Sequence, residues 1–329
     1  MKAPEHLVLS RPDSIGDVML TLPMAGLLKQ RFPGLRITFI GRGYTAPVLR
    51  HCAHVDEVLT LEDLQAGDAV AILKGLQADT LVHVFPHRAV ARWAKTAEIP
   101  VRIGTGHRWW HWTTCNKRVF FSRRKSALHE AQLNFRLLDP LGFGRMPSTE
   151  ELGRNYGFTP GAPDETVRSF LREGRRAVLL HPGSRGSAVE WGLPNFARLI
   201  QLLDPERFQV VVTGTAQERS DYAPHLPLDL PHVQDAGGRL DLDQLIALIG
   251  ASDALVAAST GPLHIAAASG KRAIGLFAPR RPIHPGRWAP LGPDAHALVH
   301  DPDCPTCASG RPCDCITRIG PEQVATLLG

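Results

Sequence analysis

Short apolar runs alternate with segments of helical period along most of this chain, and this alternation constrains the fold more than any other feature. In the first half, residues 17–31 carry apolar side chains at helical spacing and end before Pro33 and Gly34, which stop a helix. The apolar runs around this segment are short and bounded by polar residues, as buried strands are, and cover residues 6–10, 36–40, 55–59 and 80–84. Strands that alternate with helices predict a parallel sheet with helical crossovers.

The same alternation of apolar runs and helical segments restarts after residues 153–164. This stretch is rich in Gly and Pro and has no hydrophobic period, and we interpret it as a linker. The chain has 329 residues, about the length of two domains of roughly 150 residues each. We predict an N-terminal domain over 1–160 and a C-terminal domain over 161–329, each a doubly wound α/β sheet, with a ligand cleft between the carboxyl ends of their strands. In the second half, strands are expected at 177–181, 209–213, 254–258 and 273–277, and helices at 195–203, 241–249 and 262–269.

Charge and hydropathy exclude several classes of protein. The formal net charge is +5, from 37 Lys and Arg against 32 Asp and Glu, which is too small to indicate nucleic-acid binding by itself. No apolar run approaches the roughly 20 residues of a membrane-spanning helix. The N-terminus lacks the long apolar stretch and small-residue cleavage site of a signal peptide. We therefore expect a soluble protein of the cytoplasm.

The six cysteines are unevenly distributed. Cys52 and Cys115 stand alone, whereas four others crowd into the tail at positions 304, 307, 313 and 315. In a cytoplasmic chain such a cluster favours reduced or metal-binding thiols over a disulfide framework. Two pairs of thiolates suffice to hold zinc, although the one-residue gap between Cys313 and Cys315 is unusual for a structural site.

Asp17 follows the first predicted strand, in the segment Arg11-Pro12-Asp13-Ser14-Ile15-Gly16-Asp17. Gly16 permits a tight backbone there, and Asp17 lies where a helix begins. A carboxylate at this position is a common helix cap. It also suits a general base that faces the cleft. The sequence leaves both interpretations open.

Two segments of the second half suit the binding of phosphate. Residues 259–264 follow a predicted strand, and Pro262 fits the first turn of the next helix. The free amides of this helix N-terminus would form an anion site suited to a diphosphate, to which His264 adds a hydrogen bond or a charge. Residues 181–187 form a small, flexible loop that either approaches phosphate or is a simple turn. Neither a GxGxxG fingerprint nor a Walker loop is present. The missing GxGxxG fingerprint, which binds dinucleotides, argues against a dehydrogenase.

Residues 99–129 contain no acidic side chain, and three of the six tryptophans lie there. The basic residues of the segment are Arg102, Arg108, Lys117, Arg118, Arg123, Arg124 and Lys125. A block of one sign with aromatic residues indicates an anionic or amphipathic partner, such as a phosphorylated sugar, a membrane surface or a nucleic acid, unless it is a basic face without function.

Several of these segments, in this order, resemble glycosyltransferase family 9, the ADP-heptose:lipopolysaccharide heptosyltransferases. The resemblance rests on RPDSIGDVMLTLP at 11–23, VRIG at 101–104, residues 181–187, Trp191 with Phe196, and TGPLHIAAA at 260–268. Residues 275–279 and the tail at 304–319 also resemble that family. The resemblance implies a GT-B architecture of two Rossmann-like domains that face a cleft. It further implies acceptor binding on the N-terminal domain and nucleotide-sugar binding on the C-terminal one.

The family transfers heptose with inversion and without a required metal, so the resemblance implies no cofactor and no metal in the site. By position in the motif, Asp17 matches the catalytic base. The predicted donor-binding residues are Ser184, Arg185, Thr213, Ser259, Thr260, Gly261, Pro262, Leu263 and His264. The predicted acceptor-binding residues are Ser14, Gly16, Arg102, Arg108 and Arg123. The expected partners are ADP-heptose and a phosphorylated lipid-linked oligosaccharide, with peripheral contact at the inner membrane and no nucleic acid.

The sequence departs from the family's pattern at two positions that touch donor binding. Val189 stands where a Lys is typical, and Ser259 stands where an Asp is typical. These departures favour a second interpretation, a related transferase that uses another nucleotide-sugar. A third interpretation is a non-catalytic protein that binds an anionic glycan or a nucleotide-sugar.

Overall fold

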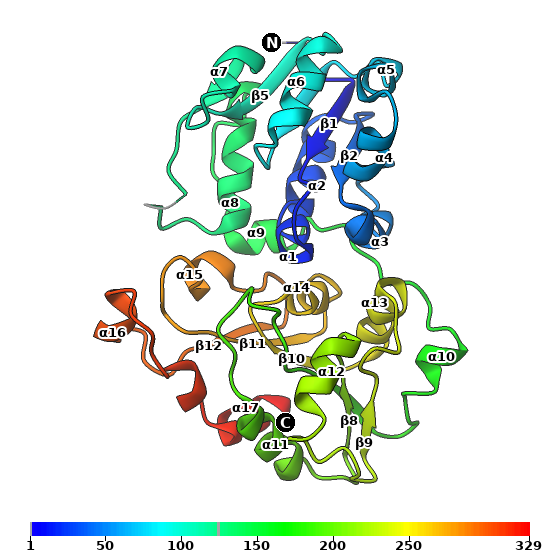
Figure 1. Cartoon of the computed structure of the whole chain (residues 1–329), viewed down its shortest axis with the longest axis vertical. Helices are drawn as coiled ribbons and strands as arrows, with labels where there is room; N and C mark the ends of the chain where they lie inside the picture. Colours follow the sequence, from blue (N-terminus) through cyan, green and yellow to red (C-terminus); the bar gives the residue numbers. More distant parts are fainter. Residues whose placement is uncertain (1, 124–125) are drawn as a thin grey trace. The chain divides into compact units, whose positions relative to one another are not determined.

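A computed structural model describes residues 2–123 and 126–329 of the chain, which divide into two compact units, Met1–Thr159 and Pro160–Gly329. The division falls inside the segment interpreted as a linker. Part of that segment is bound to the first unit, because Phe158 forms an antiparallel bridge with Cys52. Figure 1 shows the two units and labels most of their elements.

The first unit is built on a parallel six-stranded sheet in the order β3-β2-β1-β4-β5-β6. Its strands are β1 (His6–Ser10), β2 (Arg36–Gly41), β3 (Glu57–Thr60), β4 (Thr80–His83), β5 (Val101–Thr105) and β6 (Lys117–Val119). Its helices are α1 (Ile15–Met19), α2 (Leu22–Arg31), α3 (Ala46–Arg50), α4 (Leu61–Ala66), α5 (Ala69–Gly75), α6 (Arg88–Thr96), α7 (His111–Thr114), α8 (Glu130–Phe135) and α9 (Thr149–Gly153), with 3-10 turns η1 (Gly43–Thr45) and η2 (Arg136–Leu141).

The second unit repeats the plan with a parallel six-stranded sheet in the order β12-β11-β10-β7-β8-β9. Its strands are β7 (Arg176–His181), β8 (Phe208–Val212), β9 (Val233–Asp235), β10 (Ala254–Ala258), β11 (Arg272–Leu276) and β12 (Ala295–Leu298). Its helices are α10 (Glu165–Arg168), α11 (Leu193–Leu202), α12 (Ala216–Tyr222), α13 (Leu242–Ala251), α14 (Gly261–Ala268), α15 (Pro285–Trp288), α16 (Pro305–Ala308) and α17 (Pro321–Leu328), with the 3-10 turn η3 (Ile316–Arg318).

The central strands are buried along their whole length, because helices cover both faces of each sheet (Figure 1). In the first unit, α4, α5 and α6 pack on the face that carries Val8 and Leu81. In the second unit, α11 and α17 pack on the face that carries Val178, Val210 and Val256. The doubly wound α/β fold expected from the sequence is confirmed for each unit.

One predicted helix is wrong in detail. Residues 17–31 form two helices, α1 and α2, with Leu20 and Thr21 between them. Pro23 explains the break: it lies in the first turn of α2, where its missing N–H costs nothing, and it would interrupt a continuous helix. Because of this break, α1 has only five residues and lies shortly after β1.

The strand order reverses between β1 and β4 in the first unit and between β7 and β10 in the second. Sheets of this kind bind ligands beyond the carboxyl ends of the strands at the point of reversal. In the first unit this edge carries the segment that leads into α1. In the second unit it carries the loops that follow β7, β8 and β10.

Candidate active site

The carboxylate of Asp17 lies in the first turn of α1, just beyond the carboxyl end of β1. It accepts a hydrogen bond from the guanidinium of Arg11 and another from the hydroxyl of Ser14, with 2.5 Å between Ser14 Oγ and Asp17 Oδ2. Ser14 occupies the N-cap position, so Asp17 is not the helix cap. The Asp17 side chain is 17% exposed. A carboxylate that is fixed on one side and open on the other can accept a proton from a bound hydroxyl.

Arg11 supports Asp17 from the interior. Its side chain is only 5% exposed, and its guanidinium lies 3.5 Å from a carboxylate oxygen of Asp13 and 3.5 Å from one of Glu130. Burial by itself would lower the pKa of the Arg11 guanidinium, but the three surrounding carboxylates hold that pKa above its usual value. Burial raises the pKa of Asp13, and the neighbouring Asp17 carboxylate adds to the rise. The cluster therefore holds the Asp17 carboxylate in one orientation.

Arg123, predicted to bind acceptor, reaches this cluster through α8. Its guanidinium donates to Glu130 Oε1 and, over 3.0 Å, to Asn134 Oδ1. Asn134 in turn donates to the backbone oxygen of Leu20, over 3.1 Å, at the end of α1. No sequence motif indicated a role for Arg11, Glu130 or Asn134. The last two are four residues apart and so share one helix face, which is the one local signal that could have indicated them.

The other predicted acceptor residues divide into two groups. Gly16 lies next to Asp17 within α1. Arg102 instead donates to the backbone oxygens of Ile99 and Thr114, the latter over 2.7 Å. The guanidinium carbon of Arg108 lies 5.7 Å from the centre of the Trp110 ring. None of the contacts described for residues 2–123 and 126–329 links Arg102 or Arg108 to Asp17.

Thr260 begins α14 at the carboxyl end of β10. It holds the N-cap position, but its side chain makes no capping hydrogen bond. The residue is 6% exposed, and its Oγ1 has no hydrogen-bond partner among the residues that the structure describes. A buried hydroxyl without a partner is costly, so this atom is suited to meet a bound ligand.

The backbone at the start of α14 adds donors beside Thr260. The first amides of a helix have no intrahelical acceptor, and in this turn Gly261 and Leu263 carry such N–H groups while Pro262 has none. His264 is 2% exposed on the same turn. Together with the positive end of the helix, these groups form a site for an anion.

Residues at the ends of β7 and β8 border this site. His181 pairs with Ala257 across the sheet, and its Nδ1 lies 3.0 Å from Thr213 Oγ1. Burial lowers the pKa of His181, against the opposing effect of the Glu218 and Glu190 carboxylates. His181 is therefore disposed to be a neutral partner of Thr213 rather than a cation.

The loop after β7 is a tight turn held by Glu190. Glu190 Oε1 accepts from the amide of Ser184 over 2.9 Å and from its hydroxyl over 2.8 Å. Arg185 and Gly186 have φ of +50° and +78°, and the amide of Ser187 closes the turn on the Ser184 oxygen over 3.0 Å. The Ser184 hydroxyl thus serves the loop itself, whereas Arg185 is exposed at its tip. Val189, which replaces the typical Lys, packs against the core of the second unit.

Comparison with known protein families shows which family this chain belongs to. The model of the family described as glycosyltransferase family 9 (heptosyltransferase) matches residues 95–314, about two thirds of the chain. The chain belongs to glycosyltransferase family 9. It is therefore a glycosyltransferase, as the sequence motifs predicted, and the interpretation as a non-catalytic binding protein loses its support.

Individual relatives are distant but cover most of the chain. A protein of Haemophilus influenzae, provisionally named a glycosyltransferase, is 29% identical over 306 residues, which are 87% of this chain and 86% of that protein. Lipopolysaccharide heptosyltransferase 3 of Escherichia coli is 23% identical and covers 80% of each chain. The structure of E. coli ADP-heptose lipopolysaccharide heptosyltransferase II superposes with a TM-score of 0.77 at 21% identity, over 98% of this chain and 97% of that one. This likeness confirms the predicted GT-B fold.

The basic segment at 99–129 presents aromatic rings at the surface. Trp109, Trp112 and Phe120 are 63%, 56% and 57% exposed. The guanidinium carbon of Arg88 lies 4.8 Å from the centre of the Trp109 ring, and that of Arg118 lies 4.7 Å from the centre of the Trp112 ring. Arg124 and Lys125 of the same segment lie outside the described residues. Within the described part of the chain, no helix combines the length and hydropathy needed to cross a bilayer.

Proposed function

We propose that this glycosyltransferase transfers heptose from ADP-heptose to a lipopolysaccharide core or a related glycan acceptor, with inversion at the anomeric carbon. Support comes from the relatives, which include lipopolysaccharide heptosyltransferases 2 and 3 of E. coli. The observation that carries the proposal is the Asp17 carboxylate at the end of β1, held by Arg11 and Ser14 and still partly exposed.

The first unit would supply the base in a single displacement. The acceptor hydroxyl passes its proton to the Asp17 carboxylate as its oxygen attacks the anomeric carbon of the donor. The bond from that carbon to the diphosphate oxygen breaks, and ADP leaves with the electron pair. General-base assistance of this kind contributes roughly 10²- to 10⁴-fold to the rate.

The second unit would stabilise the leaving group. Negative charge builds on the diphosphate as the bond breaks, and the amides of Gly261 and Leu263 at the start of α14 are oriented donors for it. The Thr260 hydroxyl adds a donor that is buried and without a partner among the described residues. His264 in the same turn is a further donor, and the exposed Arg185 supplies a cation.

A second candidate is the same reaction with a different nucleotide-sugar. Ser259 precedes the anion site in place of the acidic residue that the family resemblance implies for the sugar hydroxyls. Val189 packs inward and cannot provide the cation of a Lys at that position. Both changes bear on donor selection and leave Asp17 untouched.

The test is a transfer assay on the purified chain with a panel of ADP-, UDP- and GDP-sugars, each first screened for thermal stabilisation of the protein. We expect ADP-heptose to stabilise the protein and to be consumed with an inner-core acceptor. Stabilisation by another nucleotide-sugar alone would favour the second candidate. Binding of none of them would refute both.

Two variants test the base. Asp17→Asn should bind the donor with unchanged Kd and lose transfer by roughly 10²- to 10⁴-fold. Asp13→Asn is the matched control: this carboxylate also lies near Arg11, at 3.5 Å, but it receives no bond from the Ser14 hydroxyl. Equal rates for the two variants would refute the role of Asp17.

We further propose that the basic and aromatic surface around Trp109, Trp112 and Phe120 contacts the anionic membrane that carries the lipid-linked acceptor. Exposed indole rings paired with guanidinium groups are suited to an interface of acyl chains and phosphates. Sedimentation with vesicles containing anionic lipid tests the contact. The double variant Trp109→Ala/Trp112→Ala should lose vesicle binding and keep its activity on a soluble acceptor. Equal sedimentation of variant and wild type would contradict the proposal.

A further inference from the structure

Four cysteines of the second unit converge in the segment between β12 and η3. Cys304 is the N-cap residue of α16 and Cys307 lies within that helix, whereas Cys313 and Cys315 lie on the stretch that returns toward η3. Cys304, Cys307 and Cys315 are 7%, 1% and 4% exposed, and Cys313 is half-buried. All four are free thiols. None of them belongs to the residues proposed above to hold the donor or the acceptor.

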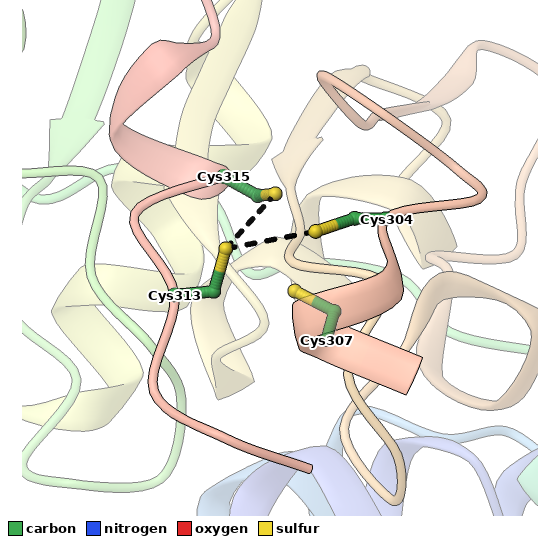
Figure 2. Close-up of side chains that lie close together, drawn as sticks. All are labelled: Cys304, Cys307, Cys313 and Cys315. Atoms are coloured by element: carbon green, nitrogen blue, oxygen red, sulfur yellow. Dashed lines mark hydrogen bonds between the residues drawn. The ribbon is translucent and has the colours of Figure 1, made fainter. Parts of the chain in front are cut away.

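The sulfur atoms have the arrangement of a four-ligand site. All four Sγ atoms lie within 4.8 Å of one another. Cys313 Sγ lies 3.7 Å from Cys304 Sγ and 3.2 Å from Cys315 Sγ. Figure 2 shows the four side chains directed toward a common centre from two sides of the segment. A tetrahedron with metal–sulfur bonds of about 2.3 Å has edges of about 3.8 Å, close to these separations.

We propose that Cys304, Cys307, Cys313 and Cys315 bind one thiophilic divalent metal ion, with zinc as the expected occupant. Four thiolates in a tetrahedral arrangement select zinc or iron over the hard cations, and zinc closes such a site without redox chemistry. The one-residue gap between Cys313 and Cys315, which makes the spacing unusual, does not prevent convergence, because their sulfur atoms lie on the same side of the returning stretch (Figure 2).

The metal would hold together a segment that has little regular structure of its own. Between β12 and η3 the only helix among the described residues is α16, with four residues. Cys304, Cys307 and Cys315 belong to the buried cluster that also contains Ile316, Ile319 and Trp191, and Cys313 packs against it. Trp191 Nε1 donates to the backbone oxygen of Ile319 over 2.8 Å. A metal at the cysteines would therefore fix the chain that leads to this contact and to α17, and would stabilise the second unit.

Elemental analysis of the full chain, purified without a metal-binding tag, tests the proposal. We expect one zinc ion per chain, released when the thiols are modified. Cys307→Ser and Cys313→Ser should each lose the metal. Cys115→Ser is the matched control, because Cys115 is also a buried, free thiol but lies in the first unit, and this variant should keep its metal. Retention of metal by the Cys307 and Cys313 variants would overturn the proposal.

A second measurement does not depend on the folding of any variant. The metal is removed from the reduced wild-type chain with a chelator, and cobalt(II) is added in its place. We expect a thiolate-to-cobalt charge-transfer band together with the intense d–d bands of a tetrahedral site, both saturating at one equivalent, and a melting temperature that falls on chelation and recovers with metal. Absence of the band, or recovery of the four cysteines as two disulfides from freshly purified protein, would overturn the proposal. Iron in place of zinc would keep the four-thiolate site and overturn the choice of zinc.

Discussion

Replacement of Thr260 by Val tests the donor site, because it should weaken donor binding while the stability of the unliganded protein stays the same or rises. Valine matches threonine in shape and has a methyl group in place of the hydroxyl. The Thr260 side chain makes no capping hydrogen bond, so the substitution takes no cap away from α14. Its Oγ1 is buried and has no partner among the described residues. An unsatisfied buried hydroxyl costs about 1–3 kcal/mol, so the free energy of unfolding of the unliganded protein should stay the same or rise.

Donor binding should weaken in the same variant. A hydrogen bond from a hydroxyl to a charged phosphate contributes about 1.5–3 kcal/mol. If Thr260 donates one to the diphosphate, Kd for the donor should increase roughly 10- to 100-fold in Thr260→Val. Titration calorimetry measures Kd, and urea denaturation without ligand measures the free energy of unfolding.

Ser252→Ala is the control for loss of a buried hydroxyl in the same unit. Ser252 precedes β10 at the end opposite to Thr260, and its Oγ donates to the backbone oxygen of Ile249 over 2.8 Å. This variant should lose about 1 kcal/mol of unfolding free energy and keep its donor affinity. An unchanged Kd in Thr260→Val would refute the reasoning, as would a loss of stability equal to that of the control.

Three further predictions concern stability. Arg11→Met should lower the free energy of unfolding by about 3–5 kcal/mol, because the buried carboxylate of Glu130 loses part of its pairing; a loss below about 1 kcal/mol in urea denaturation would contradict this. Burial, with the nearby His111, Arg102 and His87 charges, holds the pKa of His83 well below its usual value. Below about pH 6.5 the unfolded chain therefore binds a proton at His83 that the folded chain does not bind. The free energy of unfolding should fall as pH drops below this value, by up to ~1.4 kcal/mol per pH unit for this group. His83→Leu should flatten that slope, and an identical slope in denaturation curves between about pH 5 and 7 would argue against it. Gly292→Ala would place a Cβ 2.2 Å from the backbone oxygen of Ala267. This clash should lower the free energy of unfolding by about 1–3 kcal/mol and with it the melting temperature. An unaltered melting temperature would disprove the clash.

Much of the fold could be predicted from local patterns. The runs at 6–10 and 254–258 coincide with β1 and β10 because strands buried on both faces read as continuous apolar segments. The short strand β6 escaped prediction: its three residues, Lys117–Val119, carry too little apolar character to register as a strand. The break between α1 and α2 was missed because the apolar period continues through it, although Pro23 was visible in the sequence.

The candidate site was predictable only where it is local. Asp17 and Thr260 each follow a strand and precede a helix, so the chain itself brings them to the edge where such sheets bind ligands. The groups that hold Asp17 include Glu130, which is 119 positions from Arg11 in the sequence. Likewise, nothing in the sequence of the loop after β7 indicated that Glu190 accepts a hydrogen bond from the Ser184 hydroxyl.

The amino-acid sequence by itself determined the period of each element, the junctions where strands pass into helices, and the presence of four thiols within twelve residues of the tail. These are properties of neighbouring residues, and short-range sterics and hydrophobic burial suffice to set them. Only the tertiary structure decided that Arg11 lies between Asp17 and Glu130, and that four sulfur atoms come within 4.8 Å of one another. Such contacts depend on how whole sheets and loops pack, because a hydrogen bond or a metal ligand set forms only when groups from separate segments arrive at the right distance and orientation.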